Sequence, residues 1–157
     1  MNRQIIESYA LGGPELAESI KGLTQADFLA TPVPSGGGTW SIQQIVLHLM
    51  DSDLIASDRM KRIIAEDNPT IVGYSESAFA TRLFYEEAEP ALAAEIFAKN
   101  RLLTAAILRR LPDPAFARFG THNQRGRVTL AQMVAGYVDH LAHHLKFLRH
   151  KRHLLGK

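Results

Sequence analysis

The sequence predicts an all-α protein that folds as a four-helix bundle. Four segments of the 157-residue chain carry apolar residues at the 3.6-residue period of an amphipathic helix. Two of these segments begin with a capping box, and no segment alternates apolar and polar residues for long enough to build a sheet. We expect residues 1–157 to form a single domain, because a chain of this length can bury one core.

A broken helix of about 20 residues is expected at the N-terminus. Its apolar series is interrupted by the Gly-Gly-Pro segment 12–14 and then resumes. Thr24 and Asp27 have the spacing of a cap for one short turn. The segment 31–38, rich in proline and glycine, is expected to be a loop.

The second helix has a clear start signal. Ser41 as N-cap and Gln44 three residues later form a capping box, and Trp40 and Ile45 stand where a hydrophobic staple would be. Its apolar stripe continues for more than twenty residues, and the helix should end near residues 67–69.

The third helix is expected from Glu89 to Arg110, with Pro90 in its first turn. The long link before it, residues 67–88, should hold a short helix over residues 75–85. A link of this length can carry the chain back along the bundle, so the second and third helices need not be antiparallel. The apolar stripe predicted for the third helix consists of Leu92, Ile96, Leu103, Ala106 and Ile107.

The last helix begins as the second one does. Thr129 and Gln132 form its capping box, and we expect it to run to about residue 153. Residues 115–128, which precede it, are expected to be a loop. Its apolar stripe is centred on Leu130, Val134, Tyr137, Leu141, Leu145 and Leu148.

Composition narrows the possible chemistry. The chain has no cysteine, which excludes disulfides, thiolate metal sites and a cysteine nucleophile, so any metal must be held by His, Asp or Glu. The net charge of +2 does not indicate nucleic-acid binding. No apolar run has the length of a signal peptide core or a membrane span, and we therefore expect a cytoplasmic protein without membrane contact.

Three histidines are candidate metal ligands. His140 and His144 are four residues apart, so on a helix they project from one face, at the edge of the apolar stripe. His48 flanks the stripe of the second helix, whereas His143 falls on the polar face of the last one. Three imidazoles without a fourth protein ligand are typical of an open, reactive metal site. A surface position, or a complement to the helix dipole, remains the alternative reading of such histidines.

Three short motifs, spread over about residues 15–150, together resemble one family. They are the segment 40–51, with Trp-Ser at its start and His-Leu-x-Asp at its end, the segment 139–144 with the pattern D-H-x-x-H-H, and the glycine-containing segment 120–130. In these motifs the chain resembles the DinB/YfiT-like family of metalloenzymes.

The resemblance implies a four-helix bundle in the up-down-down-up arrangement and a homodimer. It also implies a divalent metal ion, nickel or zinc, held by His48, His140 and His144 with water completing the coordination. Characterised members of this family include transferases and isomerases that use a low-molecular-weight thiol.

An open metal site of this kind can acidify water or a thiol, or polarise a carbonyl group. The segment from His140 to His144 lacks the glutamate of an H-E-x-x-H peptidase. We therefore expect a metal-dependent enzyme acting on a small molecule, either a thiol-dependent S-transferase or a hydrolase. The alternatives are a non-catalytic, stress-related bundle that binds a metal or ligand, and a structural dimer with vestigial histidines.

Five further residues are candidates for lining the pocket. Ser52, Ile55 and Arg59 lie on the His48 side of the second helix, and Arg59 could meet an anionic substrate. Tyr137 lies one turn before His140, although core packing is an alternative role for it, and His122 is either part of the pocket or a solvated loop residue.

Overall fold

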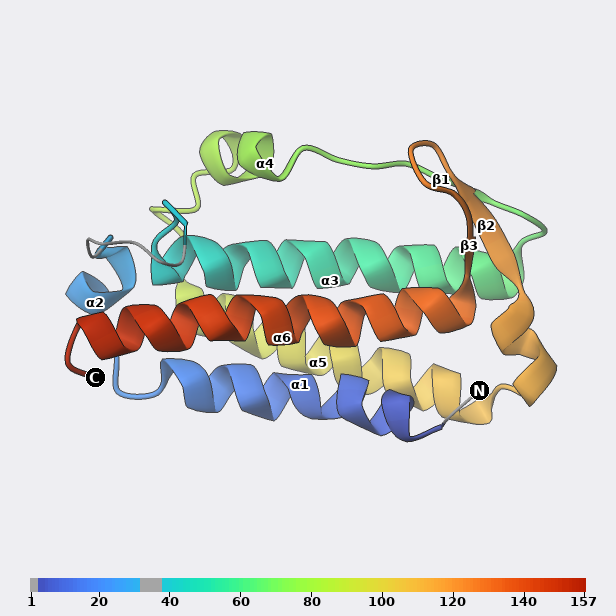
Figure 1. The fold of residues 1–157 in the computed structure, drawn as a ribbon, viewed down its shortest axis with the longest axis horizontal. Coiled ribbons are helices and arrows are strands. Elements are labelled where there is room, and N and C mark those ends of the chain that lie inside the picture. Colours follow the sequence, from blue (N-terminus) through green and yellow to red (C-terminus); the bar gives the residue numbers. More distant parts are fainter. Residues whose placement is uncertain (1–2, 32–37) are drawn as a thin grey trace.

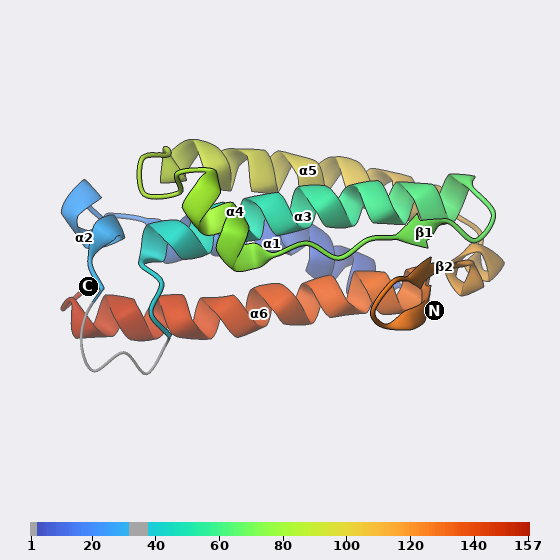
Figure 2. The same ribbon diagram turned by 90° about the horizontal axis from the view of Figure 1, so that it is seen from above.

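The computed structural model describes residues 3–31 and 38–157, which form an elongated four-helix bundle (Figure 1). The long helices are α1 (Gln4–Ile20), α3 (Ile42–Ala65), α5 (Pro90–Arg110) and α6 (Leu130–Leu154). α1 and α6 run in one direction and α3 and α5 in the other, which confirms the up-down-down-up arrangement (Figures 1 and 2). Each of α1 and α3 packs against both α5 and α6. None of the described helices is long and apolar enough to cross a membrane.

The predicted helix starts are confirmed. Ser41 caps α3 and Thr129 caps α6, each through a complete capping box. A third box, formed by Thr24 and Asp27, starts the short helix α2 (Gln25–Leu29). Most of the loop predicted at residues 31–38 lies outside the described residues.

The predicted break in the first helix is wrong, because α1 continues through Pro14. Gly12 and Gly13 are buried and serve close packing. A Cβ atom on Gly13 would lie 2.7 Å from the Cβ of Ala98 on α5, and one on Gly12 would lie 2.3 Å from Nη1 of Arg101. These glycines therefore let α1 approach α5.

The expectation of a protein without any sheet is also wrong. Three short strands, β1 (Thr70–Ile71), β2 (Phe119–His122) and β3 (Gly126–Thr129), form a sheet at the end of the bundle where α3 stops and α6 begins. β1 is parallel to β2, and β2 and β3 form an antiparallel hairpin. A 3₁₀-helix (Asp113–Ala117) precedes the hairpin. Each strand has at most four residues, which is too short for alternation to be recognised in the sequence.

The link between α3 and α5 runs back along the whole bundle and contains α4 (Glu76–Arg82) (Figure 1). The side chain of Ser75 caps α4 by accepting a hydrogen bond from the amide of Ala78. This link lies over α3, beside the face where α3 meets α6 (Figure 2).

The apolar stripe predicted for the third helix faces outward, so that prediction is wrong. Leu92 is 55% exposed and Leu103 is 70% exposed. The buried face of α5 has only two large apolar residues, and the others are small or polar. Its buried residues are Pro90, Ala93, Ala94, Phe97, Arg101, Thr104, Ala105 and Leu108. Partners on α1 and α3, rather than the hydrophobicity of α5, decide which face is buried.

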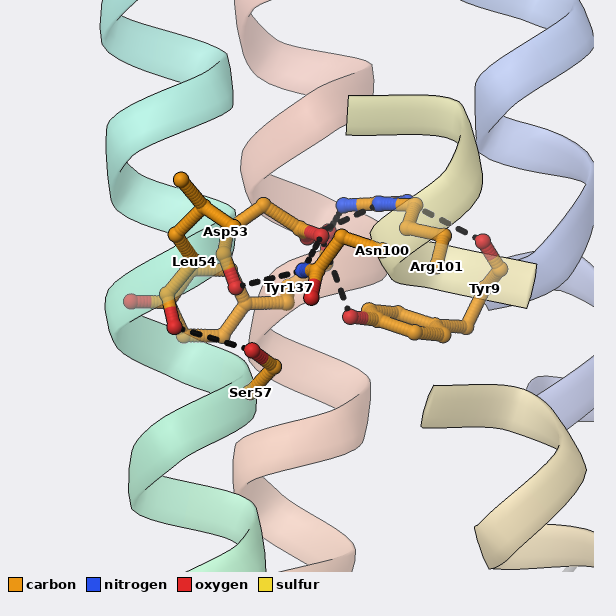
Figure 3. Close-up of polar contacts among 7 residues, drawn as sticks. All are labelled: Tyr9, Asp53, Leu54, Ser57, Asn100, Arg101 and Tyr137. Carbon is orange, nitrogen blue, oxygen red and sulfur yellow. Dashed lines mark hydrogen bonds and ion pairs between the residues drawn. The ribbon is translucent and has the colours of Figure 1, made fainter. Parts of the chain in front are cut away.

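A buried polar network joins the four long helices (Figure 3). Arg101 Nε donates to Asp53 Oδ1 at 2.9 Å, and its two other nitrogens donate to the carbonyls of Tyr9 and Tyr137. Asp53 Oδ2 also accepts from Asn100 Nδ2 at 2.8 Å and from the hydroxyl of Tyr9 at 3.2 Å. The guanidinium lies 4.4 Å from the ring centroids of both Tyr9 and Phe97. Arg101 and Asp53 thus satisfy each other's hydrogen-bonding groups in a fully buried part of the core.

This network divides the core into two apolar clusters. On α3 one cluster covers residues 42–49 and the other residues 56–63, with Asp53 between them. On α5 the first cluster ends at Phe97 and the second begins at Ala105, with Arg101 between them. The bundle therefore has a polar layer at mid-length.

Candidate metal centre

The three histidines singled out by the sequence lie together between α3 and α6. His48 comes from α3, and His140 and His144 lie one turn apart on α6. One ring nitrogen of each lies within 4.8 Å of the others. The Nε2 atoms of His48 and His140 are 3.1 Å apart. Two nitrogens bound to one tetrahedral zinc ion lie about 3.3 Å apart, so this spacing is that of shared ligands.

The cluster lies against aromatic side chains. His48 is fully buried, and the other two rings are half-buried. The ring of Trp40 meets the ring of His48 edge-on, with 5.1 Å between the ring centroids, which agrees with a packing role for this tryptophan. The ring of Phe147 lies edge-on to that of His144, with 6.3 Å between the centroids. This setting shields His48 fully, and His140 and His144 in part, from bulk water.

Burial keeps the three rings uncharged. It lowers the pKa of His48 to about 4, with the charge of His144 adding to the effect. Burial likewise lowers the pKa of His140 to about 3 and that of His144 to about 4. At neutral pH all three imidazoles are therefore neutral and have lone pairs available to a cation.

The donor set fits a divalent ion. Among the described residues, Nδ1 of His48 and Nδ1 of His144 are buried without a hydrogen-bond partner. An ion shared through the facing Nε2 atoms of His48 and His140 would leave the ring proton of His48 on this buried Nδ1. Three neutral imidazoles without a fourth protein ligand leave a coordination position free for water or substrate.

A cavity of about 200 Å³ adjoins this cluster. Ser52 and His140 line it near the histidines, and Arg59, His122 and Arg125 line it toward the hairpin. Ser52 and Arg59 are seven residues apart on α3, so the cavity extends about 10 Å along the bundle. Its volume and lining suit a small polar ligand.

Four of the five residues that the sequence suggested for the pocket line this cavity. Ser52, Arg59, His122 and Tyr137 all line it, whereas Ile55 does not. Tyr137 also has its ring 5.6 Å from the ring of His140.

The environment of His122 fixes its tautomer. Nδ1 of His122 accepts a hydrogen bond from the backbone amide of Gln124 at 3.1 Å. Burial and the charges of Arg59 and Arg125 lower the pKa of His122, so the ring is neutral near pH 7. The neutral ring then carries its proton on Nε2, and this N–H is available to a ligand.

Sequence reasoning missed Glu76. This residue is the first of α4, in the link above the site, and it lines the same cavity as His140. It also lines a second cavity that contains Trp40, His144 and Phe147. The serine before it is a helix-start signal, but only the path of the link brings Glu76 to the histidines.

The remaining acids and histidines near the motifs have other surroundings. Asp51, the acid of the first motif, accepts a hydrogen bond from the hydroxyl of Tyr85 at 2.6 Å. His143 and Asp139 are exposed on the outer face of α6, as the helical wheel indicated.

Comparison with known proteins identifies the family. A model of the DinB superfamily matches residues 12–148. The chain belongs to the DinB superfamily. This DinB chain is 28% identical over 143 residues to a Bacillus subtilis protein named "Putative metal-dependent hydrolase YfiT", with 90% of the chain and 79% of the relative covered. An Oceanobacillus iheyensis relative with the same functional name is 29% identical over 117 residues, which cover 74% of the DinB chain and 66% of the relative.

A solved structure gives the same result at the level of the fold. The DinB chain matches the structure of YfiT from Bacillus subtilis with a TM-score of 0.89 and 25% identity, covering 98% of this chain and 86% of that one. That structure is described as "a probable metal-dependent hydrolase with an unusual four-helix bundle topology".

Proposed function

We propose that this DinB protein is a metal-dependent hydrolase of a small molecule. The observation that carries the proposal is the convergence of three neutral imidazoles beside a cavity of about 200 Å³. The names of the relatives support it. In this proposal His48, His140 and His144 hold one divalent ion, zinc or nickel, and the adjoining cavity holds the substrate.

A bound divalent ion supplies Lewis acidity, which polarises a carbonyl oxygen and lowers the pKa of water. The protein's own residues supply the proton transfers and the orientation of the substrate. Glu76 accepts a proton from the attacking water, because it is the one acidic residue in the described lining of both cavities. As water adds to the acyl carbon and the bond to the leaving group breaks, Glu76 returns the proton to that group. The Tyr137 hydroxyl and the Nε2–H of His122 orient the polar groups of the substrate.

Transfer to a low-molecular-weight thiol is the second candidate function. One observation favours it: Glu76 is exposed in the link and makes no hydrogen bond or ion pair with another described residue. A thiol with a pKa of about 8.5 loses its proton much more readily than water and needs a base less. The thiol would occupy the open position beside the three imidazoles.

The test begins with protein purified without a histidine tag, since a tag would compete for the metal. Elemental analysis should find about one divalent ion per chain, and His48→Ala should lose both the ion and the hydrolysis of 4-nitrophenyl esters. His143→Ala is the matched control, because this neighbouring histidine is exposed, and it should retain both.

The Glu76→Gln variant should keep the metal and lose most of the esterase activity, on the order of a hundredfold. Unchanged turnover in Glu76→Gln would remove Glu76 from the mechanism. Turnover of thiol–electrophile pairs without ester hydrolysis would favour the transferase. Ligand-induced stabilisation without any product would favour a non-catalytic binding protein.

We also propose that the protein is cytoplasmic and works as a homodimer. Cell fractionation tests the location, and sedimentation equilibrium tests the dimer.

A further inference from the structure

We propose that the cavity beside the metal centre selects a substrate that carries a carboxylate, and that Arg59, Arg125 and His122 bind this carboxylate at the hairpin end. The inference rests on the proposed function for the identity of the reacting end of the substrate. The binding of the carboxylate itself is independent of metal and turnover.

Arg59 carries a charge that no acid in the described chain neutralises. It is half-buried on α3, and its hydrogen bonds go to neutral acceptors, namely the carbonyl of Val72 and the hydroxyl of Tyr137 at 3.5 Å. Its guanidinium also lies 6.0 Å from the ring centroid of Tyr74. These contacts hold the side chain against the cavity and leave its positive charge for a ligand.

Arg125 and His122 add to this positive end. Arg125 lies in the turn between β2 and β3 and lines the same cavity. The charges of Arg59 and Arg125 both act on His122, so the three side chains face one region. His122 contributes its Nε2–H, because its Nδ1 is occupied by the amide of Gln124. Two guanidinium groups and one N–H donor are a set that binds a carboxylate.

The opposite charge lies elsewhere in the cavity. Glu76 is the one acid that lines it in the described part of the chain, and it also borders the histidine cluster on the other side. The cavity lining thus combines one acid, Glu76, with two guanidinium groups toward the hairpin. A substrate would place its scissile group beside His140 and its carboxylate about 10 Å away, beside Arg59.

Binding is best measured in a metal-free background. The probes are adipate, its neutral diamide adipamide, and inorganic phosphate, titrated calorimetrically into the His48→Ala protein. We expect adipate to bind at least tenfold more tightly than adipamide, with an affinity that falls as salt rises. If phosphate binds more tightly than adipate, the assignment to a carboxylate is overturned.

Three arginine variants locate the site. Arg59→Gln and Arg125→Gln should each weaken adipate binding about tenfold or more. Arg62→Gln is the matched control, since Arg62 lies on the outer face of α3 paired with Asp58 and Glu66, and it should leave binding unchanged. Arg125 is exposed, so its variant tests the site even if Arg59→Gln fails to fold.

The two proposals can fail separately. Adipate binding without metal or hydrolysis would refute the hydrolase and leave the carboxylate site standing. A metal-loaded protein that hydrolyses neutral esters but binds adipate no better than adipamide would refute the carboxylate site alone.

A second, independent observation concerns the outer face of α5. Four large apolar residues form a stripe there: Leu92 (55% exposed), Ile96 (37%), Leu103 (70%) and Ile107 (37%). The four side chains share one face of α5, with the charged Lys99 between Ile96 and Leu103, and large apolar residues gathered on one exposed face mark an interaction surface. We infer that this stripe binds a second copy of the same chain.

The order of the residues supports this choice of partner. Leu92 and Ile107 are equally far from the midpoint between Lys99 and Asn100, and so are Ile96 and Leu103. Two α5 helices crossing antiparallel at this midpoint would therefore place apolar residues of one chain against apolar residues of the other.

Charges along the stripe are also compatible with a two-fold axis. The same pairing sets Glu89, at the start of α5, against Arg110 of the other copy, at its end. Lys99, near the axis, is paired with Glu95 of its own helix at 2.6 Å, which limits the repulsion between the two copies.

Sedimentation equilibrium tests the interface. The wild-type chain should be a dimer, and Leu103→Glu should be a monomer with unchanged helix content, because residue 103 is exposed in a single chain. Leu83→Glu, at a position 51% exposed near α4, is the control and should stay dimeric. A wild-type monomer, or a dimer that survives Leu103→Glu, would overturn the inference.

Discussion

Replacing Asp53 with alanine should lower the stability of the protein more than any surface change. Arg101 would be left in the core without its counter-charge, because Arg101 is 0% exposed and Asp53 is 1% exposed. The change also removes the acceptor for the hydroxyl of Tyr9 and for Nδ2 of Asn100.

The expected loss is about 3–5 kcal/mol of unfolding free energy, the cost of removing one partner from a buried ion pair. Domains of this size lose about 2–4 °C of melting temperature per kcal/mol, so Tm should fall by roughly 6–20 °C. Since total stabilities are about 5–15 kcal/mol, the variant should still fold at low temperature.

Urea unfolding followed by circular dichroism measures this loss. The double variant Asp53→Leu/Arg101→Met should recover most of it, because apolar residues of similar size can replace a buried pair. Glu7→Ala is the control, since it breaks an exposed ion pair with Arg109 and should shift the urea midpoint far less.

Either of two results would show that pairing of Arg101 with Asp53 is not what stabilises this part of the core. One is a loss below about 1 kcal/mol for Asp53→Ala, the value of an exposed pair. The other is a double variant that is less stable than the single one, which would show that packing shape rather than charge pairing dominates.

Three further outcomes are expected. Gly13→Ala should destabilise the protein by about 1–3 kcal/mol in urea unfolding, because its Cβ would lie 2.8 Å from the backbone of Ala98, whereas Gly136→Ala, which meets open space, should stabilise α6 by about 0.5–1 kcal/mol. If both changes act alike, close approach of the helices is not the reason for Gly13. In metal-free protein, burial lowers the folded pKa values of the clustered histidines to about 3 and about 4, so on acidification the unfolded chain takes up protons first. The unfolding free energy should therefore be highest above about pH 6.5 and decrease as pH falls toward 4. A urea midpoint that stays flat over this pH range would contradict those lowered values. A chelator should remove the stabilisation that metal binding adds, about 2.7 kcal/mol of unfolding free energy at a metal concentration of 100 Kd, and so lower the Tm of the metal-loaded protein. It should leave the Tm of His48→Ala unchanged, and equal shifts in both proteins would place the metal elsewhere.

Local signals explain what the sequence predicted correctly. Capping boxes at Ser41 and Thr129 depend on residues three apart, and the placement of His140 and His144 on one face depends on helical spacing alone. The prediction that His48 shares a metal with that pair needed the family resemblance as well. A position at the edge of an apolar stripe does not indicate which other helix lies beside it.

What the sequence did not predict depends on partners far along the chain. Asp53 and Arg101 are charged residues, which a sequence alone assigns to the surface. Only the packing of α3 against α5 shows that they form a buried ion pair. The buried face of α5 was misassigned because four of its large apolar residues lie outside, while Phe97, Leu108 and several small residues are buried. Gly12 and Gly13 look like a helix break unless the close neighbours on α5 and α6 are known.

The parallel course of α3 and α5 has a consequence for how such a protein could diversify. Because the chain must return the full length of the molecule between these helices, the link forms a strap along the bundle (Figure 1). Three residues of this strap, Gly73, Tyr74 and Glu76, line the cavity and form its roof. An alternating bundle, whose neighbouring helices are joined by short turns, would have no such strap. Changes in the strap can therefore reshape the roof while the helices beneath keep their packing and the imidazoles keep their positions.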